Sequence, residues 1–503
     1  MQEFDLVVIG GGINGAGVAR DASGRGLSVL LCEKDDLAQA TSSSSTKLIH
    51  GGLRYLEFFH FNLVRESLRE REILLNSMPH IIWPLRFILP HHNGLRPAWF
   101  LRLGLFLYDH IGGRKLLPAT KKINLKNHES GNPLKKNFSV AFEYSDCWVE
   151  DSRMVILNAK DAKLKGATIK THTSFENAKR KDDLWEITLR DNKTSIEKTI
   201  ISKSIVNCAG PWVTNVIDEK LNEKNDIGIR LIKGSHVITK KLFKKNHNYI
   251  FQNSDGRIVF AIPYESDFTL IGTTDIEYEG DPGEVRCSLE EKKYLVESVS
   301  NYLSNPVSTN DIVHTYSGVR PLFNDNKTKA QNVTRDYVIK TNSQNRKAPL
   351  INVFGGKITT YRILAEKVMN ELKPYFSNLE KKWTKNSNLP GGNFNPNEFD
   401  ELVKEIMDKY KYLDKKWAIR LLRAYGKDSF DILNNSLKIE DLGINFGWNL
   451  TEKEILWMVE NEFAETTEDI LWRRSKLGLR FSHDQVKYLE NWLKDNIKIH
   501  THY

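Results

Sequence analysis

Residues 5–34 read DLVVIGGGINGAGVARDASGRGLSVLLCEK, and this stretch decides the fold class of the chain. The apolar run LVVI is typical of a buried parallel strand. It leads into three glycines with G-x-G-x-x-G spacing, which are Gly10, Gly12 and Gly15. Residues 14–24 have the pattern of a helix, and a second apolar run, LSVLLCE, ends at Glu33. Strand, glycine turn, helix and strand in this order predict the first unit of a Rossmann-like α/β fold.

The spacing of the three glycines predicts a site for the diphosphate of a dinucleotide. The first glycine allows a tight turn, the second lets the backbone approach the pyrophosphate, and the third lets the helix pack against the strand. The diphosphate then lies at a helix N-terminus, where unpaired N–H groups and the helix dipole favour anions. Glu33 can accept a hydrogen bond from a ribose hydroxyl, and its charge disfavours a 2′-phosphorylated ribose. The motif alone does not separate NAD from FAD.

Length and composition limit the class of protein. At roughly 100–200 residues per domain, a chain of 503 residues is expected to form about two to four domains. Its hydrophobic content of 40% and charged content of 27% are close to globular averages, which argues against extensive disorder. The net charge of +9 is compatible with a phosphorylated substrate, an acidic membrane or a nucleic acid, and selects none of them.

The cysteines and the N-terminus bear on the cellular compartment. The four cysteines are widely spaced and include no C-x-x-C pair, so we expect neither a disulfide framework nor a metal site, and a reducing compartment fits. The N-terminal residues lack the cations and the apolar length of a signal peptide. No run reaches the ~18 apolar residues of a membrane span. The longest candidate, residues 98–108, contains Arg102.

A second stretch, ATSSSSTKLIHGGLRYLE at residues 40–57, combines a Ser/Thr run with dense polar chemistry. Small hydroxyls can line a phosphate or ribityl path without steric bulk. Gly51 and Gly52 allow the backbone to approach a flat ring. The alternative is an ordinary solvated loop, since Ser-rich stretches are often that. The adjoining KLIHGGLRY favours a functional loop.

Seven motifs, in order along the chain, carry a family resemblance: GGGINGAG, ATSSSSTKLIHGGLRYLE, EYSDCW, LIKGSH, GTTD, SGVRPL and FGGKITTYR. Together they resemble the FAD-dependent glycerol-3-phosphate dehydrogenases of the bacterial aerobic, membrane-associated type. The resemblance extends over essentially the whole chain. Thr46 replaces the serine that is usual in the family and keeps its hydroxyl. The resemblance implies that the cofactor is FAD and that residues 40–57 form a flavin-binding loop leading into the active site.

The motifs and the resemblance together predict the residues of the site. The predicted cofactor-binding residues are Gly10, Gly12, Ile13, Asn14, Gly15, Glu33, Thr41, Ser42, Thr46, Lys47, Leu48, His50, Gly51, Gly52, Ala209, Gly210, Gly355, Gly356, Lys357, Ile358 and Thr359. The predicted substrate-binding residues are Arg54, Tyr55, Arg320, Lys357 and Thr359. The predicted catalytic residues are His236, Arg320 and Lys357.

Oxidation of a secondary alcohol requires a hydride acceptor, a base for the hydroxyl proton and groups that hold the substrate. Arginine suits a phosphate because its planar fork makes two-point contact with the oxygens. His236 is the candidate base, since a neutral imidazole can accept a proton near neutral pH. A structural histidine is the alternative at this position, and His50 is the second candidate. Arg320 can also stabilise a developing alkoxide.

The remaining pattern predicts a DAO/glutathione-reductase-like architecture. We expect a discontinuous Rossmann-like FAD-binding domain at 1–80, 140–225 and 345–388. An antiparallel-sheet substrate-binding domain at 226–344 is inserted into it, with a hairpin turn at Asp255–Gly256. Residues 389–503 are expected to form a C-terminal helical cap domain after a Pro/Gly-rich linker.

Residues 81–139 are expected to form a membrane-interface segment. Within 80–115, aromatic residues alternate with arginines, which suits a helix lying in a bilayer interface. A buried core helix is the alternative, and the resemblance favours membrane contact.

The resulting hypothesis is a flavoenzyme that oxidises sn-glycerol 3-phosphate to dihydroxyacetone phosphate and passes electrons from FAD to a membrane quinone. We expect it in the cytoplasm, attached peripherally to an anionic lipid surface at the inner face of the cell membrane. The oligomeric state is open, with a homodimer among the candidates. Rival hypotheses are an oxidase that uses oxygen and an amine or amino-acid oxidase of the same fold. A nucleic-acid partner is not expected, because no RNA-binding motif is present.

Overall fold

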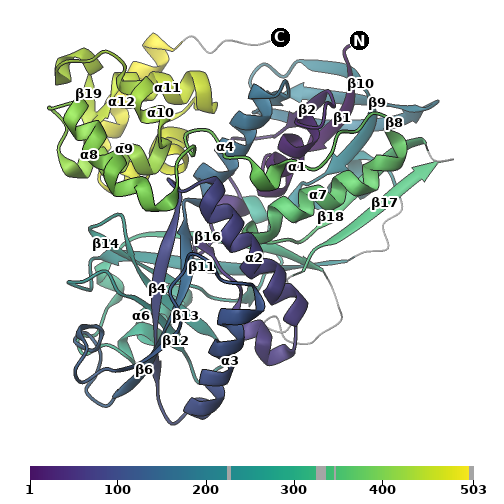
Figure 1. Cartoon of the computed structure of the whole chain (residues 1–503). Helices are drawn as coiled ribbons and strands as arrows, with labels where there is room; N and C mark the ends of the chain where they lie inside the picture. Colours follow the sequence, from purple (N-terminus) through teal and green to yellow (C-terminus); the bar gives the residue numbers. More distant parts are fainter. Residues whose placement is uncertain (224–227, 324–335, 345–346, 498–503) are drawn as a thin grey trace.

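The computed structural model describes residues 1–223, 228–323, 336–344 and 347–497. Figure 1 shows a sheet with helices against it, a second sheet below it, and a cluster of C-terminal helices beside both. The predicted domain boundaries at 225/226 and at 345, and the last six residues of the predicted cap domain, lie outside the described residues.

The first sheet has the order β17-β18-β10-β1-β2-β7, in which β18, β10, β1, β2 and β7 are parallel and β17 pairs antiparallel with β18. The hairpin β8–β9 joins it by antiparallel pairing of β9 with β10. Its strands are β1 (Glu3–Ile9), β2 (Val29–Cys32), β7 (Thr168–Lys170), β8 (Thr173–Lys181), β9 (Leu184–Asp191), β10 (Glu197–Asn207), β17 (Val338–Gln344) and β18 (Lys347–Phe354). The carboxyl ends of β1, β2, β10 and β18 therefore meet at one edge, where ligands of open α/β sheets bind.

The helix α1 (Ile13–Ser23) follows β1 and packs with α4 (Asp151–Leu164) and α7 (Tyr361–Leu372) against the first sheet. The Rossmann-like unit predicted from residues 5–34 is thereby confirmed. Gly10 has φ +103°, a conformation that L side chains rarely adopt. A Cβ on Gly15 would lie 1.9 Å from the carbonyl oxygen of Gly10, so only glycine allows α1 to approach the turn this closely.

The second sheet follows the order β15-β11-β14-β13-β12-β4-β6-β3, with β16 paired to β11 and β5 to β6. Its strands are β3 (Leu48–Ile49), β4 (Ile82–His91), β5 (Lys121–Asn124), β6 (Val140–Val149), β11 (Ile229–Lys240), β12 (Asn248–Gln252), β13 (Ile258–Tyr264), β14 (Phe268–Gly272), β15 (Ile276–Glu277) and β16 (Ile312–Phe323). The helix α6 (Leu289–Ser300) packs on one face of it. β12 and β13 pair antiparallel across the turn predicted at Asp255–Gly256.

The structure corrects the interpretation of 80–115 as one interfacial helix. Residues 82–91 form β4, which pairs with β6 and β12 inside the second sheet, and only α3 (Ala98–Ile111) is helical. Pro84 and Pro90 explain the difference, since each would break a helix interior. The expected segment 81–139 is likewise not a separate unit, because β4 and β5 belong to the second sheet together with β6.

The helix α2 (Phe61–Ser77) lies in sequence between β3 and β4 of the second sheet. The C-terminal part beyond residue 389 is mainly helical with a hydrophobic core of its own (Figure 1). Its elements are α8 (Phe399–Lys409), α9 (Lys415–Tyr425), α10 (Asp428–Leu433), β19 (Asn445–Gly447), β20 (Leu450–Thr451), α11 (Glu452–Glu462) and α12 (His483–Asn496). Among the described residues, none of the helices has both the length and the apolar content to cross a bilayer.

Candidate active site at the edge of the first sheet

A cavity of about 1040 Å³ lies between the two sheets at the carboxyl edge of the parallel strands. One wall is built from the turns after β1, β2, β10 and β18, and the other includes Gln252 and Phe260 from the second sheet. This volume is at the upper end of the range of roughly 300–1,000 Å³ for small-molecule sites, so it suits a dinucleotide together with a small substrate.

The predicted nucleotide end of the cavity is the turn between β1 and α1. A Cβ added to Gly12 would lie 3.2 Å from the Ser42 hydroxyl, and no other atom of the described residues, its chain neighbours aside, would lie within 4 Å of it. The backbone of Gly12 therefore faces open space. The first turn of α1 contains no acidic residue, which keeps its N-terminus favourable for anions. The Oδ1 atom of Asn14 is buried in the cavity wall without a hydrogen-bond partner among the described residues. These features fit a diphosphate at the end of α1.

Glu33 closes the adjoining part of the cavity. Its carboxylate accepts hydrogen bonds from the backbone N–H groups of Gly11 at 2.6 Å and Asp35 at 2.9 Å. Burial raises the pKa of Glu33 above its usual range, against the lowering effect of those two hydrogen bonds. The side chain is thus held at the end of β2, the position from which an acid reaches a ribose hydroxyl.

The Ser/Thr run of residues 41–46 follows the cavity wall. Thr41 donates a hydrogen bond to the carbonyl of Val319 at 2.6 Å, and Ser45 donates to Asp151 at 2.7 Å. Lys47 does not line the cavity: it is 1% exposed and its Nζ lies 2.8 Å from the Asp151 carboxylate. Lys47, expected at the cofactor, instead ties the loop to α4.

Two further predicted glycines act in packing and do not line the cavity. Gly15 lies inside the α1–β1 contact, and Gly51 is buried under Leu68, whose side chain would be 2.4 Å from a Cβ at this position. The N–H of Gly51 donates to the Tyr108 hydroxyl at 2.7 Å. Gly52, with φ +75°, does line the cavity.

The structure brings the predicted substrate-binding residues together at the other end of the cavity. Its walls there include Arg54, Tyr55, Arg320, Lys357 and Thr359, which come from segments far apart in the sequence. The Lys357 Nζ lies 4.1 Å from the centroid of the Tyr55 ring. Arg320 donates to Asp275 at 2.6 Å, which fixes the orientation of its guanidinium group. This arrangement can bind a dianionic group.

His236 is placed differently from the expectation of a base in the cavity wall. It shares a face of β11 with Gly234, which does line the cavity, but His236 itself is 0% exposed. Its Nε2 lies 2.9 Å from the Thr46 hydroxyl, and its ring stacks on Tyr316 at 4.7 Å. Burial, with the charges of Arg320 and Lys47, lowers the pKa of His236 well below its usual value. Thr46 therefore lies between this neutral imidazole and the cavity.

All the other predicted cofactor-binding and catalytic residues line the cavity. They are Gly10, Ile13, Ser42, Leu48, His50, Ala209, Gly210, Gly355, Gly356 and Ile358, in addition to those described above.

Sequence reasoning missed several lining residues. Thr273 and Asp275 lie within the GTTD motif, so the motif itself could have identified them. Phe175 on β8 and Trp212 after β10 carry no local signal, because only the strand order of the first sheet brings them to the nucleotide end. Trp212 lies under Lys34, whose Nζ is 3.9 Å from the ring centroid.

Comparison with protein families gives two matches. Residues 5–362 match the family described as FAD dependent oxidoreductase, and residues 382–494 match the C-terminal domain of alpha-glycerophosphate oxidase. The chain is 48% identical over 498 residues to the D-erythritol 1-phosphate dehydrogenase of Brucella abortus, which covers 99% of each chain. It is 48% identical to a glycerol-3-phosphate dehydrogenase of Pseudomonas aeruginosa, with 98% of this chain and 95% of that protein covered. It is also 45% identical to the aerobic glycerol-3-phosphate dehydrogenase of Escherichia coli, with 98% of both covered.

Solved structures show the same fold. The glycerol-3-phosphate dehydrogenase of Bacillus halodurans, complexed with FAD, has a TM-score of 0.75 at 24% identity and covers 98% of this chain and 94% of its own. The L-alpha-glycerophosphate oxidase of Mycoplasma pneumoniae, with FAD bound, has a TM-score of 0.59 at 16% identity, with 78% of this chain and 100% of its own covered.

Proposed function

The chain belongs to the FAD-dependent oxidoreductase family, among the glycerol-3-phosphate dehydrogenases, and from this premise we propose that it oxidises sn-glycerol 3-phosphate to dihydroxyacetone phosphate. FAD, when bound, would supply the hydride acceptor, and we propose a membrane quinone as the acceptor of the electrons. The residues around the β1–α1 turn, Glu33 and the 41–46 loop would hold the cofactor.

The observation that carries the proposal is the cationic end of the cavity. Arg54, Arg320 and Lys357 all line the cavity, and the Nζ of Lys357 lies 4.1 Å from the ring centroid of Tyr55, the neighbour of Arg54 in the sequence. The phosphate of the substrate is the anion that such a group recognises, and arginine offers it two-point contact. Asp275 keeps the Arg320 guanidinium in place before the substrate arrives, which reduces the entropy lost on binding.

The proton of the substrate hydroxyl requires an acceptor. We assign this role to His236 acting through Thr46, whose hydroxyl can donate to the imidazole while it accepts from the substrate. The lowered pKa keeps His236 neutral at physiological pH, so its ring can act as an acceptor, while the same burial and the charges of Arg320 and Lys47 reduce its affinity for the proton. Arg320, beside the reacting end, would stabilise the developing alkoxide.

A second substrate has comparable support. The D-erythritol 1-phosphate dehydrogenase and the glycerol-3-phosphate dehydrogenase of Pseudomonas aeruginosa are equally similar to this chain, at 48% identity. Both names describe a polyol with a terminal phosphate, and the cationic end of the cavity would hold either phosphate. The two differ by one CHOH unit, so the space beyond the phosphate decides between them.

The electrons are proposed to leave through a membrane surface around α3. This helix exposes Trp99 at 69% and Phe106 at 57%, and the neighbouring Phe59 is exposed at 76%. The same surface continues into the cavity mouth, which is lined by Phe59, Phe61, Phe100, Leu103 and Leu107. A lipid-dissolved quinone could enter the cavity along this apolar path, while Arg96 and Arg102 face anionic headgroups. The protein would then lie peripherally at the cytoplasmic face of the cell membrane.

The test is anaerobic reduction of the flavin in the purified full-length protein. Glycerol 3-phosphate should bleach the flavin absorbance, and glycerol without phosphate should not. D-Erythritol 1-phosphate in a parallel cuvette ranks the two candidate substrates by rate. Re-oxidation by a quinone much faster than by air supports the dehydrogenase, whereas rapid re-oxidation by air with peroxide formation identifies an oxidase. Bleaching by an amino acid but by neither phosphate would refute the proposal.

A further inference from the structure

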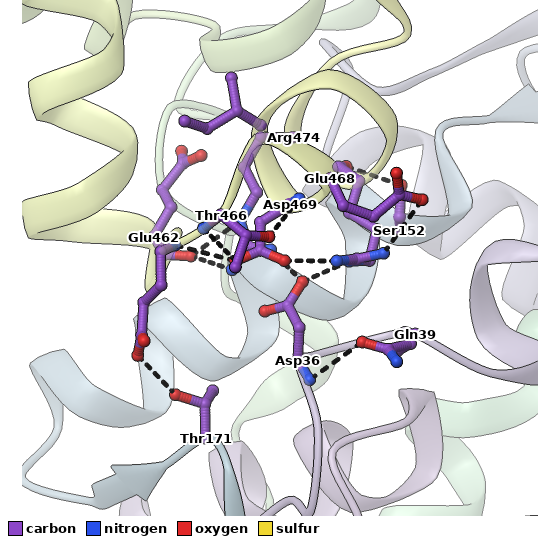
Figure 2. Close-up of polar contacts among 12 residues, drawn as sticks. Asp36, Gln39, Ser152, Thr171, Glu462, Thr466, Glu468, Asp469 and Arg474 are labelled. Carbon is purple, nitrogen blue, oxygen red and sulfur yellow. Dashed lines mark hydrogen bonds and ion pairs between the residues drawn. The ribbon is translucent and has the colours of Figure 1, made fainter. Parts of the chain in front are cut away.

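A buried carboxylate, Asp36, connects the loop after β2 to the C-terminal helical part. Asp36 is 1% exposed, and its Oδ2 accepts hydrogen bonds from both Arg473 and Arg474 in the helical turn Asp469–Arg474 (Figure 2). Arg474 is 0% exposed. Two guanidinium groups on one carboxylate, far from water, form a contact whose loss leaves uncompensated buried charge.

The two arginines are themselves held in place. Arg474 donates from Nε to the carbonyl of Glu462 at 3.0 Å, and Arg473 pairs with the carboxylate of Asp469. Asp469 in turn accepts the N–H groups of Glu465 and Thr466, each at 2.8 Å. The guanidinium groups thus have a fixed position in the C-terminal part, from which both donate to Asp36.

Asp36 lies in the middle of a loop that faces the nucleotide end of the cavity. The cavity is lined by residues on both sides of it: Glu33, Lys34, Asp35, Ala38, Gln39 and Ala40. Asp36 and Gln39 exchange hydrogen bonds across the turn, at 3.3 and 3.2 Å, and the N–H of Ala38 donates to the carbonyl of Gly11 at 3.0 Å. Because Glu33 is only three positions before Asp36, a shift of Asp36 displaces the side chain expected at the ribose.

The same C-terminal segment also contacts the residues that hold the 41–46 loop in place. Ser152 donates to the carbonyl of Arg473 at 2.8 Å and accepts from the Lys476 Nζ at 3.0 Å. The neighbouring Asp151 holds Lys47 and Ser45. The 33–40 loop therefore contacts the C-terminal part directly through Asp36, whereas the 41–46 loop reaches it through Asp151 and Ser152. Glu465 of the C-terminal part also contacts Thr171, two positions before the cavity-lining Thr173, but this contact lies outside the 33–40 loop.

We propose that Arg473 and Arg474 are positioning residues for the cofactor: through Asp36 they fix the 33–40 loop and so set the affinity for the adenosine half of FAD. The C-terminal part thereby completes the cofactor site without touching the cofactor. None of the described residues between 389 and 497 lines the cavity, so the effect is expected to act through the loop.

The test uses the full-length holoprotein with Asp36→Asn, Arg473→Lys and Arg474→Lys. FAD release after dilution, followed by flavin fluorescence, should show an affinity for FAD lower by on the order of tenfold in each variant, which corresponds to about 1.4 kcal/mol. Adding Arg474→Lys to Asp36→Asn should cost little more, because both changes break the same contact.

Competition identifies the half of FAD that is affected. If the adenosine half is weakened, FAD and ADP lose affinity together, so the ADP concentration that displaces half of the FAD stays unchanged. FMN keeps its affinity, and its half-displacing concentration falls by the same factor as the affinity for FAD. Unchanged values for both competitors would indicate a general loss of the site and overturn the proposal. A fall in the half-displacing concentration of ADP alone would place the effect at the flavin half of FAD, and this result would also overturn the proposal.

Arg153→Lys is the matched control. Arg153 is equally buried at the same contact between the parts, where it pairs with Glu462 at 2.9 Å and donates to the carbonyl of Ala424 at 3.0 Å, but it does not touch the 33–40 loop. At an equal loss of thermal stability, this variant should retain the parental affinity for FAD. The same FAD loss in Arg153→Lys as in Arg474→Lys would show that docking of the C-terminal part alone is responsible.

Discussion

Arg320 faces the cavity with its guanidinium already paired to Asp275. This pairing predicts that the position requires arginine and not only a positive charge. Arg320→Lys should raise the KM for glycerol 3-phosphate roughly 10- to 100-fold, because a charge-assisted hydrogen bond contributes about 1.5–3 kcal/mol. Steady-state kinetics with a soluble dye acceptor measure this effect.

Arg96, at the mouth of the same cavity, provides the control for Arg320. Arg96→Ala should leave the KM unchanged in the dye assay, since this exposed side chain stacks over Phe100 away from the cationic end. FAD content should match the parent in both variants. An unaltered KM in Arg320→Lys would exclude Arg320 from phosphate binding.

His236 and Thr46 are predicted to act as one unit in proton removal. His236→Ala should slow single-turnover flavin reduction at neutral pH by on the order of 10², typical for loss of a general base. Thr46→Val should cause a similar loss, and the double variant should be no slower than either single one, because both break one path. Reduction at the parental rate in Thr46→Val between pH 6 and 9 would rule out the relay.

The predicted glycines that line the cavity are positioned by the local backbone. Gly12, Gly52 and Gly355 face the cavity because the turns that contain them are local structures. Lys47 and His236 lie behind the cavity wall because their side-chain directions depend on tertiary partners. Asp151 draws Lys47 away from the cavity, and Thr46 covers His236. A motif specifies which segments meet, but the partners of each side chain come from other parts of the chain.

At the scale of elements, the region that contains α3 shows that amino-acid composition alone does not locate the boundaries between strands and helices. The aromatic and arginine pattern of 80–115 is uniform, yet β4 and α3 divide it at Pro90 and Pro97. β4 has partners on both edges, so its aromatic residues are explained by sheet packing. α3 buries only Leu105, Tyr108 and Asp109, so its remaining apolar residues require another explanation.

Membrane contact through α3 predicts a selective loss of function. Replacing Trp99, Phe100 and Phe106 with serine should release the protein from anionic vesicles and slow quinone reduction at least tenfold. Dye reduction should fall less than twofold, because only the quinone must be reached through lipid. Vesicle sedimentation and the two assays on one sample measure these effects. Trp448→Ser is the control, since Trp448 is 55% exposed in the C-terminal part. Equal losses of quinone and dye activity would argue against membrane contact.

At the scale of the whole molecule, the sequence predicted the fold class but not the way in which the parts share strands. The Rossmann-like unit, the antiparallel sheet and the C-terminal helices each have a local periodicity. The pairing of β4 with β6 on one edge and with β12 on the other joins residues near 85 to residues near 145 and 250, and no local pattern encodes these contacts. The connection of the C-terminal part to the nucleotide end through Asp36 is equally non-local, because Asp36 is not distinguished from its neighbour Asp35 in the sequence.

His80 makes the contact between the FAD-binding part and the C-terminal part sensitive to acid. It is 0% exposed, and neither ring nitrogen has a hydrogen-bond partner in the described part of the chain. The His80 ring packs against Gly392 and Gly426 of the C-terminal part. A Cβ added to Gly392 or to Gly426 would lie 3.3 or 3.1 Å, respectively, from the His80 ring. Burial, with the positive charges of Arg153, Arg423 and Lys160, lowers the pKa of His80 well below 6.5.

This lowered pKa has a definite consequence for stability. The unfolded chain binds a proton at His80 as the pH falls below about 6.5, whereas the folded chain stays neutral there, so folding becomes less favourable by about 1.4 kcal/mol for each pH unit until the folded pKa is reached. Buried His236 adds to the same acid loss. In the parent, the dependence of the unfolding free energy on pH between about 6.5 and 5 includes the uptake of one proton by His80 on unfolding, and His80→Leu should reduce the slope by this one-proton contribution. His60→Leu, at an exposed position, is the control. Urea unfolding of the holoprotein, followed by tryptophan fluorescence at several pH values, measures the slope, and an identical slope in His80→Leu and the parent would show that His80 is not the acid-sensitive contact.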